Sequence, residues 1–299
     1  MMKNKTMVKA ALATVLLAIA LAGCGSKKTE ENAQTQTQQT SEAQTQAPAE
    51  APTEAQTEAP TEEQEEEPAV VPAATPQTPE EILAAEASAE KTAYLTFDDC
   101  PVNPETTELL DCLDNLGVKA TFFCIATQPN CDEIMADIVR RGHTIAIHSV
   151  SHDYSDIYSS NAAFRNDVLS MQQFIKDATG VTTNFYRFPG GSSNSIHKKY
   201  GEVSMSGCVN WLESNGFSYW DWNVSSGDAD GKASKEDVIN NILEGCECKT
   251  EAVILMHSRR DTRTTLEAIP EVVAGLRERG FTILPLTENT KPVHHNQSD

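Results

Sequence analysis

The sequence predicts an α/β protein built on a largely parallel sheet or a barrel. Strand-like and helix-like segments alternate along the last two thirds of the chain, and several of the strand-like segments end in an ionisable residue. Roughly 210 residues follow position 90, which is enough for one domain with a sizeable core. We therefore predict a single globular domain over residues 91–290.

The first 24 residues resemble a bacterial lipoprotein signal. Three lysines precede an apolar run over residues 10–21, which is too short for a comfortable membrane span. The run ends in the string LAGC, which resembles a lipobox, the motif whose cysteine is acylated. Residues 1–24 are thus predicted to be a signal peptide with lipidation at Cys24, and the protein to be held by a lipid on the extracellular face of the cell membrane. The alternative is a plain secretory signal.

Residues 25–90 are predicted to form a disordered, acidic tether. The segment is rich in Gln, Thr, Glu and Pro and has few large apolar residues, so it cannot bury enough surface to offset chain entropy. The whole chain has 44 acidic residues against 23 lysines and arginines, a formal charge of −21. This balance argues against nucleic acid as a partner, because nucleic-acid binding needs clusters of basic residues.

In the globular part, the sequence predicts that strands and helices alternate. The first helix, 106–117, has leucines at helical spacing and a glycine at its end. The other helices are predicted by the same criteria. Strands are expected at 92–97, 119–125, 144–147, 183–188, 217–224, 252–256 and 281–286. Helices are expected at 106–117, 131–142, 163–180, 235–244 and 262–279.

Four of these strands end in ionisable residues. The first ends in Asp98 and Asp99, and the others end in His148, Arg187 and His257. In parallel α/β folds the chemistry lies at the carboxyl ends of the strands. We therefore expect these side chains to meet at one rim of the sheet.

His148 and His152 are spaced like metal ligands. Four residues apart, they lie on one face of a helical turn and can share a metal, with an acid from another strand completing the set. Asp98 or Asp99 can supply that acid, and the other is then free to act as a base. Taken alone, two such histidines are more often structural.

The ordered series TFDDCP, HSVSH, RFPGG, DWNVSSGDA and ILMHS resembles the polysaccharide deacetylases, the family 4 carbohydrate esterases. The resemblance covers roughly residues 92–286. It implies a distorted parallel (β/α) barrel and a divalent metal, with Zn²⁺ expected and Co²⁺, Ni²⁺ or Mn²⁺ as alternatives. It also implies removal of acetyl groups from N-acetylated sugars.

The resemblance assigns the base and the metal ligands. Asp98 matches the general base, and Arg187 matches the residue that pairs with this base. Asp99, His148 and His152 match the metal ligands. The two acids at the end of the first strand would then have different tasks.

The remaining motifs supply the acid and the substrate contacts. His257 matches the general acid, and Asp228 matches the acidic residue that tunes it. The backbone N–H near Gly190 would stabilise the oxyanion. Trp222 and Leu255 would contact the substrate, with Leu255 and its two neighbours forming the wall of a slot for the acetyl methyl group.

The chain departs from the family pattern in the third and fourth motifs. Ser225 and Ala229 replace the usual Asp and Trp, which leaves Asp221 as a rival to Asp228. Gly190 stands where many members carry an aromatic residue, which is expected to open the groove.

The cysteines give a weaker signal. There are eight, so acylation of Cys24 would leave an odd number, with at least one free thiol and the pairing undetermined. Cys100 replaces a usual glycine directly after the paired acids. It is therefore expected to be a thiol near the metal that reagents can reach.

The leading function is a tethered deacetylase of a cell-wall polysaccharide, with peptidoglycan as the expected substrate. A chitooligosaccharide or acetylxylan deacetylase is the alternative within enzymes, and a non-catalytic carbohydrate-binding protein is the alternative from another class. An acetylated polysaccharide and the membrane are the expected partners, and the protein is expected to be a monomer. His294 and His295 are expected to belong to a solvated tail.

Overall fold

The structure, a computed structural model, describes residues 78–299 with the exception of residues 202 and 298. The predicted signal peptide, the lipidation at Cys24 and the predicted tether up to residue 77 lie outside the described residues. No helix in the described ranges combines the length and the apolar character needed to cross a membrane.

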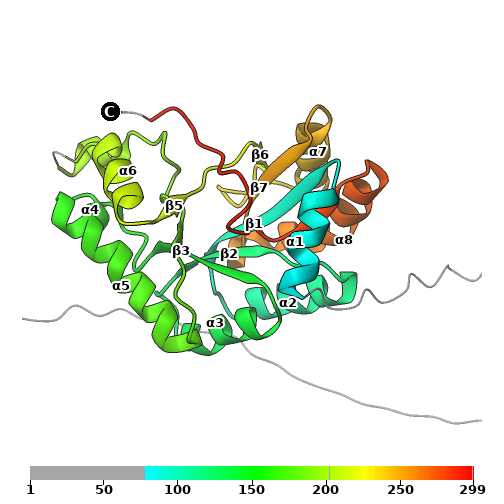
Figure 1. Cartoon of the computed structure of the whole chain (residues 1–299), viewed down its shortest axis with the longest axis horizontal. Coiled ribbons are helices and arrows are strands. Elements are labelled where there is room, and N and C mark those ends of the chain that lie inside the picture. Colours follow the sequence, from blue (N-terminus) through cyan, green and yellow to red (C-terminus); the bar gives the residue numbers. More distant parts are fainter. Residues whose placement is uncertain (1–77, 202, 298) are drawn as a thin grey trace, which may run out of the picture. The chain divides into compact units, whose positions relative to one another are not determined.

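In the described part of the chain, eight parallel strands form one curved sheet (Figure 1). They are β1 (Thr92–Cys100), β2 (Thr121–Ile125), β3 (Thr144–Ser149), β4 (Phe185–Tyr186), β5 (Ser218–Tyr219), β6 (Val224–Ser225), β7 (Glu251–His257) and β8 (Thr282–Leu284). Their order is β5-β4-β3-β2-β1-β7-β6, and β8 pairs with β1. The predicted α/β class with a parallel sheet is confirmed.

The connection between the two edge strands shows that the sheet is rolled. β5 and β6 stand at opposite ends of the strand order, but only residues 220–223 separate them in sequence. Five steps of extended chain reach about 17 Å. Seven strands laid flat at about 4.8 Å spacing would put the two edges about 29 Å apart. The sheet must therefore curve into an incomplete barrel whose open seam lies between β5 and β6.

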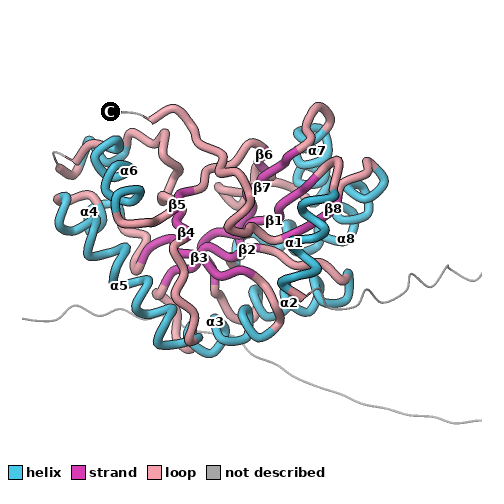
Figure 2. Tube along the Cα trace, in the orientation of Figure 1, coloured by secondary structure: helices cyan, strands magenta, loops and turns pink. Residues whose placement is uncertain are grey.

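Helices lie around the outside of the curved sheet (Figure 2). They are α1 (Pro79–Ser88), α2 (Glu105–Leu116), α3 (Cys131–Arg140), α4 (Tyr154–Ile157), α5 (Asn161–Thr179), α6 (Met205–Ser214), α7 (Lys235–Cys246) and α8 (Arg263–Glu278), with short 3-10 turns at Ile196–Lys199 and Arg260–Thr262. Gly117 ends α2 in the left-handed conformation, at φ 61°, as the predicted glycine stop requires.

The central strand β1 is buried on both faces. All nine of its residues are buried, which is typical of a strand covered on both sides. Ala93, Leu95 and Phe97 join the main hydrophobic core between sheet and helices. The alternate residues Thr96 and Asp98 point to the inside of the barrel, because successive strand residues face opposite ways.

Helix α1 corrects the predicted boundary of the tether. The tether was expected to extend to residue 90, but Pro79–Ser88 is helical. The Thr78 side chain accepts a hydrogen bond from the Glu81 N–H, and the Glu81 side chain accepts one from the Thr78 N–H, which is a capping box. The globular part therefore begins at least twelve residues earlier than the composition indicates, counted from residue 79 to residue 90.

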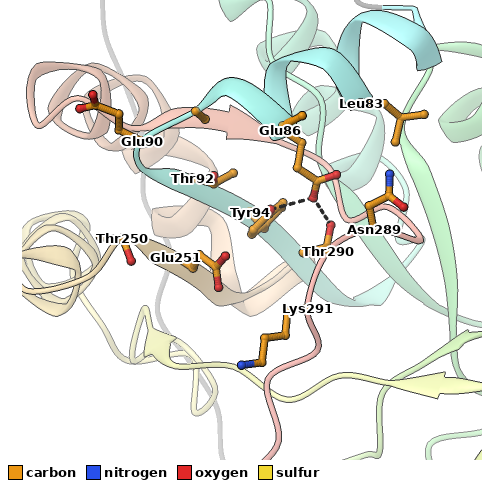
Figure 3. Close-up of a pocket in the computed structure, with 12 residues that line it drawn as sticks. Leu83, Glu86, Glu90, Thr92, Tyr94, Thr250, Glu251, Asn289, Thr290 and Lys291 are labelled. Carbon is orange, nitrogen blue, oxygen red and sulfur yellow. Dashed lines mark hydrogen bonds between the residues drawn. The ribbon is translucent and has the colours of Figure 1, made fainter.

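Contacts with distant parts of the chain hold α1 against the barrel. Glu86 accepts a hydrogen bond from the Tyr94 hydroxyl at 2.8 Å and another from Thr290 (Figure 3). It also accepts one from Thr287. Ile82 of the same helix is buried against Tyr94 in a small second core. These contacts lie at the amino ends of the strands, so α1 covers the end of the barrel opposite to the rim that carries Asp98 and Asp99.

Two further predictions about elements are corrected. The expected strand 217–224 is split into β5 and β6, and residues 220–223 between them belong to no strand. Helix α6 was not predicted; it starts where the Ser204 hydroxyl accepts a hydrogen bond from the Gly207 N–H.

Candidate active site

The two acids at the end of β1 both face the same rim, although they are neighbours in sequence. Asp98 continues the strand and pairs in register with His257 of β7. Asp99 adopts a left-handed backbone at φ 63°, and the pairing of β1 with β2 is irregular there. This local break in the strand cancels the alternation of side chains and turns both carboxylates to the inside.

Asp99, His148 and His152 come together as a potential metal site. Their ligand atoms all lie within 4.8 Å of one another. Asp99 Oδ1 lies 3.6 Å from His148 Nε2 and 3.4 Å from His152 Nε2. Two ligands about 2.1 Å from a metal at a tetrahedral angle are about 3.4 Å apart, so this spacing suits a shared ion.

The hydrogen bonds around the triad also favour a metal. Asp99 Oδ1 is buried and has no hydrogen-bond partner in the described residues, which is costly unless an ion satisfies it. His148 donates its Nδ1 proton to the Arg187 carbonyl at 2.8 Å, which leaves the Nε2 lone pair facing Asp99. Burial lowers the pKa of His148 and thus keeps its ring neutral. One carboxylate and two imidazoles fit a divalent transition metal such as zinc.

The two histidines reach this position through a loop and not through a helical turn, which was the expected geometry. His148 belongs to β3, and His152 follows in a loop at φ 57°. The Ser149 hydroxyl accepts hydrogen bonds from the N–H groups of Ser151 and His152, at 3.3 and 3.0 Å, and so fixes the loop. His148 and His152 therefore come together through a strand and a loop, and not through the helical turn that their spacing of four residues suggested.

Asp98 is held by a fully buried arginine. Arg187 Nη1 donates to Asp98 Oδ1 at 2.8 Å and to the Thr96 hydroxyl at the same distance. Its other nitrogens donate to the carbonyls of Trp220 and Asp221, both at 3.1 Å. The second Asp98 oxygen, Oδ2, lies 3.8 Å from His148 Nε2 and so remains beside the metal triad, where a base would be needed.

His257 and Asp228 form a tight pair on the other side of the rim. His257 Nδ1 lies 2.7 Å from Asp228 Oδ1, and the His257 N–H donates to Oδ2 at 2.9 Å. Thr265 also donates to Oδ2, at 2.7 Å. Burial by itself lowers the pKa of His257, but the nearby carboxylates, Asp228 first and then Asp98 and Asp99, outweigh it and raise this pKa above the ordinary value. The imidazole is thereby kept protonated to higher pH, as a proton donor requires.

The rival acid Asp221 has a different set of partners. Its carboxylate accepts hydrogen bonds from the N–H and the hydroxyl of Ser192, at 2.8 and 2.5 Å, and from the His295 N–H at 2.8 Å. No contact joins it to His257 within the described ranges. The geometry therefore favours Asp228 over Asp221 as the partner of the histidine, which the sequence left open.

The predicted substrate contacts are arranged around the same rim. Gly190 has φ 76°, and in the part of the chain that is described its N–H has no hydrogen-bond partner. A Cβ at this position would come within 2.9 Å of the Tyr154 hydroxyl, so Tyr154 occupies part of the space that the missing aromatic was expected to leave open. A Cβ on Gly191 would likewise come within 2.9 Å of the Trp222 ring.

Leu255 lies on the face of β7 that carries His257, since residues two apart in a strand share a face. Its neighbours Ile254 and Met256 belong to the core beneath the helices. Of these three residues, Leu255 alone can therefore line the predicted slot for the methyl group.

The C-terminal segment was expected to be a solvated tail at His294 and His295. His294 is exposed, but the rings of both residues pack against the barrel. The His294 ring stacks on Tyr219 with centroids 3.8 Å apart. His295 Nε2 lies 2.7 Å from the Trp222 carbonyl, and its ring packs edge-on against Trp222. The segment thus covers the seam between β5 and β6.

Cys100 is not an accessible thiol either. It is fully buried, with its sulfur 3.6 Å from that of Cys124, and burial raises the pKa of its thiol well above the ordinary value. A buried, protonated thiol is a poor nucleophile. In the described ranges all seven cysteines are free.

Arg259 is a site residue that the sequence reasoning missed. Its Nη1 donates to Asp99 Oδ2 at 3.1 Å, and Asp261 and the Ala229 carbonyl hold the rest of the guanidinium. Burial alone would raise the pKa of Asp99, but His148, His152, His257 and Arg259 together lower it. The string SRRD directly after His257 carried this signal, because it places two cations at a strand end.

A rolled parallel sheet with a metal-type triad, a carboxylate base and a paired histidine at one rim is the arrangement of a barrel hydrolase. The sequence model of the polysaccharide deacetylases matches residues 85–203. YheN of Bacillus subtilis (strain 168), a polysaccharide deacetylase by name, is 32% identical over 214 residues, which are 69% of this chain and 70% of YheN. The chain belongs to the polysaccharide deacetylase family.

Two further similarities bear on the substrate. The crystal structure of the catalytic domain of a peptidoglycan N-acetylglucosamine deacetylase from Eubacterium rectale is 41% identical, with a TM-score of 0.67, and the match covers 71% of this chain and 96% of that one. A bifunctional xylanase/deacetylase of Pseudobutyrivibrio xylanivorans is 30% identical over 202 residues, which are 67% of this chain and 30% of that protein.

Proposed function

We propose that this protein is a metal-dependent hydrolase that removes acetyl groups from the N-acetylated sugars of peptidoglycan. The observation that carries the proposal is the buried Asp99 Oδ1, which has no hydrogen-bond partner among the residues that the structure describes and faces the Nε2 atoms of both His148 and His152. It supports a bound divalent metal, with zinc as the candidate and Co²⁺, Ni²⁺ or Mn²⁺ as alternatives. The similarity to a peptidoglycan deacetylase domain over nearly its whole length supports the choice of glycan.

Each residue of the rim has a task in this reaction. A metal held by the triad would polarise the acetyl carbonyl and make a water molecule more acidic. Asp98, oriented by Arg187, accepts the proton of the attacking water. The Gly190 N–H is placed to donate to the oxyanion. His257, kept protonated by Asp228, gives a proton to the departing sugar nitrogen.

An acetylxylan deacetylase is the second candidate, and the similarity to the xylanase/deacetylase favours it. The same residues would serve an ester, which has a better leaving group than an amide and depends less on the acid. Loss of the protonated His257 is therefore expected to slow amide hydrolysis more than ester hydrolysis.

We also propose that the protein works outside the cell, attached to the membrane by a lipid on Cys24. The apolar run that ends in LAGC supports this location. Such an anchor would place the enzyme beside the peptidoglycan layer, and the acidic residues that follow would act as a spacer.

Acetate release from a panel of glycans tests the proposal. The panel contains N-acetylglucosamine oligomers, peptidoglycan strands and acetylated xylan, each with and without a chelator, and with zinc added back. We expect zinc-dependent acetate release from the peptidoglycan strands. Release from xylan alone would favour the second candidate, and binding without any release would favour a non-catalytic carbohydrate-binding protein.

A further inference from the structure

A pocket of about 360 Å³ adjoins the triad and continues beyond it. It shares two of the triad residues, so a sugar whose acetyl group reaches the triad also reaches this pocket. The lining consists of Asp99, Val102, Ile125, Gln128, His152, Arg259 and Arg260. The two arginines are the charged lining residues that the reaction described above does not use.

The two arginines differ in their surroundings. The Arg259 side chain is 24% exposed, and its guanidinium is fixed by Asp99, Asp261 and a backbone carbonyl. Arg260 is exposed, and within the described ranges no ion pair or hydrogen bond occupies its guanidinium. Arg260 is therefore a cation at the pocket mouth that is free to meet a ligand.

An unpaired arginine at this position is informative because acidic residues outnumber basic ones by 44 to 23 in the chain. Many acids could have neutralised it, as Glu108 and Glu267 do for the nearby Arg263. The planar guanidinium is suited to a carboxylate, which it can bind through two parallel hydrogen bonds.

We propose that this pocket is a subsite for a carboxylate carried by the substrate glycan, with Arg260 as its binding residue and Arg259 as the fixed cation beside it. The inference rests on the proposed deacetylase function. A muramic sugar fits the geometry, because its lactyl carboxylate is on carbon 3, next to the acetamido group on carbon 2. A uronic acid on an acetylated xylan is the other source of the same chemistry.

The test compares acidic and neutral substrates of the zinc-loaded full chain. Peptide-free glycan strands, which carry free lactyl carboxylates, are compared with chitotetraose, which carries none. Acetylated xylan with and without glucuronic acid forms the second pair. The quantity measured is the preference, kcat/KM for the acidic substrate divided by kcat/KM for the neutral one.

Arg260→Gln should lower the preference about twofold to fivefold, mainly through KM, because an exposed ion pair is worth that much. Arg260→Glu should lower it about fourfold to 25-fold, since repulsion replaces attraction. Arg263→Gln is the matched control: it also removes an exposed arginine, which lies outside the pocket, and should leave the preference unchanged.

The outcomes separate the two proposals. If wild-type protein releases acetate from both substrates of a pair and neither Arg260 variant changes the preference in either pair, the carboxylate subsite is wrong while the deacetylase function stands. If no substrate releases acetate, the proposed function fails, and this inference fails with it. An effect confined to the muramic pair or to the xylan pair supports the subsite and identifies the source of the carboxylate.

Discussion

Replacing Asp228 by asparagine tests whether His257 acts as a protonated acid. The Asp228 carboxylate accepts three hydrogen bonds, two from His257 and one from Thr265. An asparagine has one oxygen and one NH₂ group on the same frame. If its oxygen stays on His257 Nδ1, the NH₂ group faces the His257 N–H, and donor meets donor. If it flips, the NH₂ group faces Nδ1 and favours the neutral ring.

The size of the effect follows from these contacts. In both orientations the charge of Asp228, the largest of the carboxylate effects that raise the pKa of His257, is gone, so this pKa falls. The rate should then decline at a lower pH than in the wild type, because the acid is deprotonated earlier as pH rises. General acid catalysis accelerates a reaction about 100- to 10,000-fold. This factor is the largest loss of rate expected at pH values where His257 of the variant is deprotonated and that of the wild type is not. The mismatched donor should also cost about 1–3 kcal/mol of stability.

Asp221→Asn is the matched control for this variant. Asp221 is as buried as Asp228, with 0% against 2% of its surface exposed, and its carboxylate also accepts three hydrogen bonds. It should lose comparable stability and leave the alkaline limb of the pH profile in place. The assay is kcat/KM for acetate release from pH 5 to 10, with thermal unfolding of each variant measured beside it.

If the alkaline limb of Asp228→Asn coincides with that of the wild type in protein that is still folded, Asp228 does not control the protonation of His257. A shift in Asp221→Asn alone would mean that the structure pairs the histidine with the wrong acid. Equal shifts in both variants would point to general destabilisation.

Three further predictions concern the metal, the anchor and the thiols. Asp99→Asn should lower the zinc content measured by mass spectrometry, whereas Asp98→Asn should keep its zinc and lose about 100- to 10,000-fold in acetate release; the opposite pattern would mean that the two roles are exchanged. Cys24→Ala should remove the protein from the membrane fraction or block processing of the signal, and a normally cleaved, membrane-bound variant would exclude the lipid anchor. In native protein a thiol reagent should modify the exposed Cys248 and spare Cys100, and peptide mapping that finds Cys100 modified at the same rate would contradict its burial.

The first half of the barrel could be predicted from the sequence because local signals agree there with tertiary structure. The apolar run before Asp98 is buried on both faces, and the glycine after the first leucine-rich helix adopts the left-handed backbone that only glycine takes easily. The convergence of Asp98, Asp99 and His148 followed from one general property, the common direction of parallel strands.

Other features depend on contacts that no local pattern reports. The composition of α1 continues that of the preceding Glu- and Ala-rich segment, and its Glu86 is bound by residues about 200 positions away. The strand-like segment 217–224 leaves the sheet in its middle because the carbonyls of Trp220 and Asp221 turn to Arg187. The choice between Asp221 and Asp228 likewise depended on a loop whose course the sequence does not define.

Arg187 also closes the barrel. It is fully buried, and its four donor contacts join β1, through Thr96 and Asp98, to the two carbonyls in the open seam between β5 and β6. The guanidinium therefore replaces the backbone ladder that a complete barrel would have at that place. Removing one partner of such a buried pair costs about 3–5 kcal/mol. At this residue, selection for a faster enzyme and selection for a more durable one act on the same atoms and cannot proceed independently.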